Sequence, residues 1–262
     1  MQATTIYLIP VDQGCLNLRL SALPIIQSSF GRFFAIAVAT FLFTKAPMKK
    51  FKAVIFDIDG TLANTVPLCV QAFRLALEPQ LHRPLSDEEI KAAFGPDEEG
   101  TIMKFNPPDM KKANADFMRY YKSLHEEICP KTFDGIKELL DTLKNKGVCL
   151  AISTGKGQDT TEFSLCLFDI IKYFDKIEKG SPKGSRKPEA IQEIVNAFGV
   201  EKGEVLYVGD SPGDIKESHN AGIHVAGAAW AETTDKEKLE KEKPDAIFDS
   251  VKDFAEWLYE RI

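Results

Sequence analysis

The residues of this chain best suited to chemistry are Asp57 and Asp59, which directly follow a short apolar run. Residues 53–57 are rich in β-branched and aromatic side chains, which predicts a buried strand. The spacing of two residues would point both carboxylates into one pocket. Two like charges this close repel unless a cation or protein donors offset them. Mg²⁺ suits such a pair, because it binds one or two carboxylates and keeps room for water and a substrate phosphate.

The segment Asp57-Ile58-Asp59-Gly60-Thr61 resembles the first motif of the haloacid dehalogenase (HAD) superfamily, most of whose members are Mg²⁺-dependent phosphatases. The resemblance implies that Asp57 is the nucleophile and forms an aspartyl-phosphate. It also implies that Asp59 protonates the leaving oxygen and later deprotonates water. The plainer interpretation of Asp-Gly is an acidic turn after a buried strand.

Strands and helices alternate along the chain, which predicts an α/β fold with a doubly wound parallel sheet and right-handed crossovers. Ligands bind such sheets outside the carboxyl ends of the strands. Polar residues end two further strands, Thr154 the second and Asp210 the fourth, so they are expected near Asp57. The predicted strands cover residues 53–57, 148–153, 173–177, 204–209, 222–227 and 246–248.

Two segments resemble the second and third motifs of the family. Residues 150–154, a hydrophobic strand ending in Thr154, resemble the second, with Gly155 where phosphoglycolate-phosphatase-like members commonly have Asn. The resemblance implies that Thr154 and Gly155 bind phosphate. Lys187, before a proline that fits a helix start, resembles the third-motif lysine that neutralises the phosphoryl group and the nucleophile. Lys183 and Arg186 are close enough to be rivals for that role.

The segment from Gly209 to Asp214 resembles the fourth motif, Gly-Asp-x-x-x-Asp. The resemblance implies that Asp210 binds Mg²⁺ and that Asp214 supports the ion or binds it through water. With the first motif, this makes Asp57, Asp59, Asp210 and Asp214 the expected metal site. Gly-Asp-Ser-Pro by itself could be a plain turn.

An all-helical insert separates the first and second motifs. Helices are expected at about 67–77, 86–94, 98–105 and 109–127, where apolar residues recur at helical spacing. This organisation implies a HAD-like core of residues 48–64 and 132–262 with a helical cap of residues 65–131. The cap loop Phe94–Thr101 either approaches the site or is an exposed acidic turn.

Residues 1–47 differ in composition from the rest of the chain and are left out of the fold. They contain one acidic residue, Asp12, and an uncharged, mostly apolar run at residues 33–44. Because Met48 is a plausible natural start, we interpret residues 1–47 as a non-native N-terminal extension. A targeting segment and a genuine structural element are the alternatives.

The composition narrows the function classes. A net charge of -6 argues against a nucleic-acid-binding face. Five widely spaced cysteines favour reduced thiols in a cytoplasmic protein, and no stretch is long and apolar enough to span a membrane. The expected partner is a small phosphorylated metabolite, and the chain is expected to be a monomer or a homodimer.

The resemblance is strongest to phosphoglycolate-phosphatase-like or pyrophosphatase-type members. It implies a Mg²⁺-dependent phosphatase that hydrolyses a small phosphate monoester, phosphoglycolate-like, or pyrophosphate. A β-phosphoglucomutase-like sugar phosphate isomerase is one alternative. A non-catalytic binding module on the same fold is another.

Overall fold

The computed structural model describes residues 51–262 of the 262-residue chain. The interpretations of residues 1–47 concern residues outside this range. The described residues belong to a single compact unit. A bilayer-spanning helix is not found among them, since each helix is too short or too polar for that role.

The centre of the fold is a six-stranded sheet in the order β3-β2-β1-β4-β5-β6, with every neighbouring pair parallel. The predicted parallel α/β fold is thereby confirmed. β1 lies between β2 and β4, so residues that follow these three strands meet at one edge of the sheet. The strands are β1 (Ala53–Phe56), β2 (Cys149–Ser153), β3 (Lys176–Glu178), β4 (Val205–Gly209), β5 (His224–Ala228) and β6 (Ala246–Phe248).

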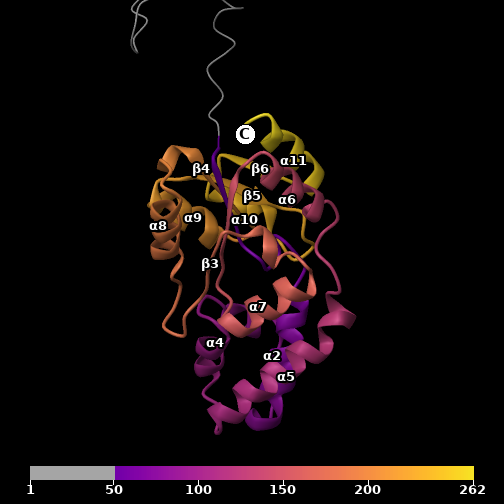
Figure 1. Ribbon diagram of the computed structural model, residues 1–262. Helices are drawn as coiled ribbons and strands as arrows, with labels where there is room; N and C mark the ends of the chain where they lie inside the picture. The colour runs from indigo at the N-terminus through magenta and orange to yellow at the C-terminus, as the bar shows by residue number, and fades with distance from the viewer. Residues whose placement is uncertain (1–50) are drawn as a thin grey trace, which may run out of the picture. The chain divides into compact units, whose positions relative to one another are not determined.

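Helices cover both faces of the sheet, as alternating side chains on the strands require. Ala53 and Ile55 of β1 belong to one buried cluster, with residues of α8 and α9, and Val54 and Phe56 belong to the other, with residues of α6 and α11. Figure 1 shows the two helix layers on either side of the strands. The helices of the core are α6 (Ile136–Asn145), α7 (Gln158–Leu167), α8 (Lys187–Phe198), α9 (Pro212–Ala221), α10 (Lys236–Lys241) and α11 (Val251–Tyr259).

Four of the five helices between β1 and β2 in the sequence lie within the insert expected from residue 65 to residue 131. Figure 1 shows α2, α4 and α5 together, next to α7 and beyond the strand ends. Phe73 of α2 packs against Phe117 of α5 with ring centroids 4.3 Å apart, which joins the two longest of these helices. The four are α2 (Val66–Leu81), α3 (Asp87–Ala92), α4 (Glu98–Phe105) and α5 (Met110–Ile128).

Several element boundaries differ by a few residues from the sequence-based prediction. The third strand was expected at residues 173–177, but Ile171–Tyr173 form a 3₁₀ turn and the strand runs over Lys176–Glu178. A short apolar run does not distinguish a strand from a buried turn. The helix that carries Asp214, α9, begins at Pro212, because Ser211 acts as its N-cap.

Candidate active site

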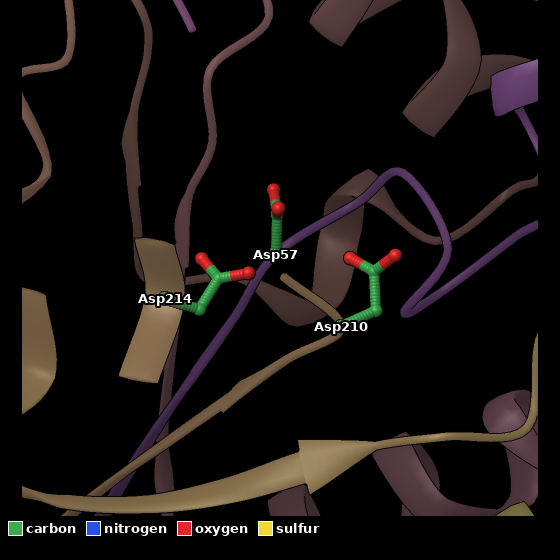
Figure 2. A group of neighbouring side chains, drawn as sticks. All are labelled: Asp57, Asp210 and Asp214. Atoms are coloured by element: carbon green, nitrogen blue, oxygen red, sulfur yellow. The ribbon is translucent and has the colours of Figure 1, made fainter. Parts of the chain in front are cut away.

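Three carboxylates from separate elements converge beyond the end of β1. Asp57 follows β1, Asp210 follows β4, and Asp214 lies in the first turn of α9. One oxygen of each lies within 4.8 Å of the others, and Figure 2 shows the three side chains around one space. Gly60 permits this approach, because its φ is +71° and a Cβ there would lie 2.1 Å from an Asp210 oxygen.

Lys187, at the start of α8, is the cation of this group. Its Nζ lies 3.1 Å from Asp57 Oδ2 and also donates to Asp214 Oδ1. The rival candidates lie elsewhere: Arg186 forms an ion pair with Glu193, and Lys183 is exposed. The structure therefore brings Lys187, rather than its neighbours, to the predicted nucleophile.

Burial and mutual repulsion set the protonation of the carboxylates. Burial raises the pKa of Asp57 to about 6, with Lys187 opposing the shift and Asp214 adding to it. Burial, with the charges of Asp214 and Asp57, raises the pKa of Asp210 well above its ordinary value. Burial alone would raise the pKa of Asp214, but Lys187 and hydrogen bonds from Ser211 outweigh this effect and lower the pKa of that carboxyl.

This group fits a hard divalent cation. Three buried or half-buried carboxylates face one lysine, so negative charge is left over in a site largely removed from water. Carboxylate oxygens are the ligands that Mg²⁺ prefers. The structure does not bring Asp59 into this group, although the sequence-based prediction included it.

Asp59 instead faces the cap. Its carboxylate accepts a hydrogen bond from Thr65 Oγ1. It also forms an ion pair with Lys156, whose Nζ lies 3.0 Å from Oδ1 and 3.4 Å from Oδ2. Thr65 is the N-cap residue of α2, but its hydroxyl makes no capping bond. The Asp59 carboxylate is thus oriented by one residue at the start of the cap and one from the core.

Sequence reasoning missed Lys156. Its side chain is only 2% exposed, and its Nζ also lies 3.3 Å from Cys69 Sγ and 4.8 Å from the centre of the Tyr121 ring. Burial alone would lower the pKa of Lys156, but Asp59 and other neighbours raise it well above its ordinary value. The available signal was its position two residues after Thr154, at the end of a buried strand, where a lysine can reach the site.

The two predicted phosphate-binding residues after β2 lie differently. Gly155 lines the cavity above the carboxylates. Thr154 is buried, and its Oγ1 accepts a hydrogen bond of 3.3 Å from the Lys156 amide. Thr154 therefore shapes the turn that delivers Lys156, and it is not among the residues lining the cavity.

A cavity of about 280 Å³ lies over this group, between the strand ends and the helical insert. The loop and helix start at Phe94–Thr101 contribute much of its lining, so the cap loop approaches the site. Glu98 joins cap to core, since its carboxylate accepts hydrogen bonds from the Gly157 amide, at 2.7 Å, and from Thr160 Oγ1, at 2.5 Å. The Asp97 amide donates to the Ser181 carbonyl at 3.1 Å.

The chain is similar to known phosphatases over most of its length. Residues 54–228 match the model of the haloacid dehalogenase-like hydrolases. A candidate pyrophosphatase PpaX from Clostridium perfringens is 32% identical over 200 residues, which are 76% of this chain and 92% of that protein.

Solved structures of similar proteins have the same fold. A predicted phosphoglycolate phosphatase from Haemophilus somnus 129PT matches with a TM-score of 0.65 at 25% identity, over 81% of this chain and 98% of the other. A candidate β-phosphoglucomutase from Thermotoga maritima has the same fold, with a TM-score of 0.65 at 24% identity over 81% of this chain and 100% of the other. The chain belongs to the haloacid dehalogenase-like hydrolase family.

Proposed function

We propose that the protein is a Mg²⁺-dependent phosphatase that hydrolyses a small phosphorylated compound through an aspartyl-phosphate on Asp57. The convergence of Asp57, Lys187 and two further carboxylates beneath a small cavity carries this proposal. The phosphatase and pyrophosphatase names of the relatives support it. A binding module would not need both Asp57 and Lys187, so that alternative is disfavoured.

The proposed reaction has two displacements. In the first, an Asp57 oxygen forms a bond to phosphorus while the bond to the leaving oxygen breaks, and Asp59 gives that oxygen a proton. In the second, Asp59 takes a proton from water. The water oxygen then attacks phosphorus, and the bond to Asp57 breaks to release phosphate and restore the carboxylate.

Other residues bind and orient the phosphoryl group. Lys187 offsets the charge of Asp57 and of the phosphoryl oxygens, and the backbone at Gly155 faces the same cavity. Asp57, Asp210 and Asp214 would hold the metal. When bound, Mg²⁺ supplies positive charge that stabilises the oxygens of the transferred group.

Phosphate release from a panel of phosphate esters and pyrophosphate tests this function. We expect release that requires Mg²⁺, stops with EDTA, and is lost in Asp57→Asn. Conversion of a sugar 1-phosphate to its 6-phosphate without phosphate release would favour the mutase instead. Release by Asp57→Asn at the wild-type rate would refute the aspartyl-phosphate route.

Location and assembly are also proposals. We infer a cytoplasmic protein from the cysteines: those in the part of the chain that the structure describes, Cys69, Cys129, Cys149 and Cys166, are all free thiols. A monomer or homodimer is expected, and sedimentation of the purified chain distinguishes the two.

A further inference from the structure

The charge and shape of the cavity bear on the leaving group, which the proposed function leaves open. In an in-line displacement the leaving oxygen lies opposite the attacking oxygen of Asp57. Asp57 is at the core side of the cavity, so the leaving group points toward the cap. The cap side is lined by apolar residues, Val66, Cys69, Phe73, Phe94 and Pro96, and by two acids, Asp97 and Glu98.

Positive charge is scarce in this space. Among the described residues that line the cavity, Lys156 and Lys187 are the only lysines or arginines. Lys187 is paired with Asp57 and Asp214. Lys156 is paired with Asp59, and its Nζ also contacts Cys69 and the Tyr121 ring. Neither ammonium is left to neutralise a second anionic group on the substrate.

Negative charge is abundant on the same side. Glu98 acts as a hydrogen-bond acceptor toward Gly157 and Thr160, which fixes its carboxylate at the wall of the cavity. Asp97 is held as the N-cap of α4, where it accepts from the Gly100 amide at 3.0 Å. A carboxylate or second phosphate on the leaving group would meet these two fixed acids in a space of low polarity, where like charges repel strongly.

We propose that the leaving group of the natural substrate is a small alcohol without negative charge, either neutral or carrying an amine. This inference rests on the proposed phosphatase function and narrows its substrate. The cavity of about 280 Å³ suits an alcohol of a few carbon atoms beyond the phosphoryl group. Phosphoglycolate and pyrophosphate, with their anionic leaving groups, are then poor substrates.

Three esters of similar size isolate the charge of the leaving group: ethyl phosphate, O-phosphoethanolamine and 2-phosphoglycolate. With Mg²⁺ at about pH 7.5, we expect kcat/KM for the first two to exceed that for 2-phosphoglycolate by at least about tenfold. Pyrophosphate should rank with 2-phosphoglycolate. An equal or better rate with either anionic substrate, at every Mg²⁺ concentration tested, would overturn the inference.

Substitutions test whether the cap acids cause the ranking. Glu98→Gln and Asp97→Asn each remove one charge with little change of shape, and asparagine is also a good N-cap. In each variant, the ratio of kcat/KM for O-phosphoethanolamine to kcat/KM for 2-phosphoglycolate should fall by about threefold or more. Glu99→Gln is the matched control, because Glu99 is exposed on the same helix turn and outside the cavity.

The outcomes separate this inference from the proposed function. If Glu98→Gln and Asp97→Asn melt like the wild type and leave the kcat/KM ratio of the two substrates unchanged, the cap acids do not cause the ranking. Asp57-dependent release that favours anionic substrates would refute the inference and leave the phosphatase standing. No release from the three esters, pyrophosphate or acetyl phosphate would refute both.

Discussion

Lys187 contacts two carboxylates that have different proposed roles. Its Nζ contacts Asp57, the proposed nucleophile, and Asp214, in the proposed metal site. Lys187→Met removes this charge, so the approaching phosphoryl group meets uncompensated carboxylates. We expect kcat/KM to fall by roughly 10²–10³-fold. Steady-state phosphate release measures the effect. Lys183→Met, at an exposed position four residues earlier, is the control, and an equal loss there would contradict the assignment.

Lys156 acts through Asp59 rather than on the phosphoryl group. Because the ammonium binds both Asp59 oxygens, Lys156→Met leaves that carboxylate with neutral donors alone, the Thr65 hydroxyl and the Cys69 thiol. A loosely held proton donor slows the chemical step more than it weakens binding. We expect kcat to fall about tenfold or more with KM nearly unchanged. A rise in KM with kcat preserved would show instead that Lys156 binds substrate.

At the scale of elements, the sequence predicts the sheet well and the details of its ends less well. The strands around the site are buried apolar runs that end in Asp57, Thr154 and Asp210, so pattern and turn residues predict them. The site residues on those ends follow from parallel topology alone, because such strands carry their carboxyl ends to one edge.

The features that the sequence did not predict depend on contacts between distant segments. Lys156 is an ordinary polar residue locally, and only the arrival of Asp59, Cys69 and Tyr121 makes it a buried ion-pair partner. The start of α9 is the exception, because it depends on a local capping box between Ser211 and Asp214.

The contact between α5 and α7 joins cap to core through a buried histidine. His125 Nε2 lies 3.0 Å from Ser164 Oγ, and Tyr121 and Phe168 pack edge-on against its ring. Burial lowers the pKa of His125. Below about pH 6.5 the unfolded chain therefore binds a proton at this histidine more readily than the folded protein does. Stability should therefore fall as the pH drops through that value, by at most about 1.4 kcal/mol per pH unit for one proton.

Urea unfolding at about pH 7.5, 6.5 and 5.5, which spans the ordinary histidine pKa, measures this contribution. His125→Gln removes the titrating ring, so the loss of stability across this range should be smaller than in the wild type. His219→Gln makes the same change at an exposed position on α9. Identical acid dependence in the wild type and His125→Gln would mean that other groups account for the loss.

For the whole molecule, the site is where segments far apart in the sequence meet. The carboxylates of the proposed metal site come from the ends of β1 and β4 and from α9, and Glu98 and the Asp97 amide tie the cap to the core beside them. The carboxylates at this site repel one another, and the stability of the rest of the fold must offset that repulsion. Ligands that relieve the repulsion should then stabilise the entire chain, because they bind only the folded form.

Mg²⁺ should accordingly raise the melting temperature. At about 100 times its Kd, a ligand specific to the folded state adds about 2.7 kcal/mol, which corresponds to roughly 5–10 °C for a domain of this size. Asp210→Asn removes one proposed ligand and one repelling charge. The metal-free variant should melt at or above the wild-type temperature, and its response to Mg²⁺ should be less than half as large. Scanning calorimetry with Mg²⁺ and with EDTA gives both values. Asp134→Asn, at a side chain 90% exposed, should keep the full response. A full response in Asp210→Asn would mean that the ion is held elsewhere.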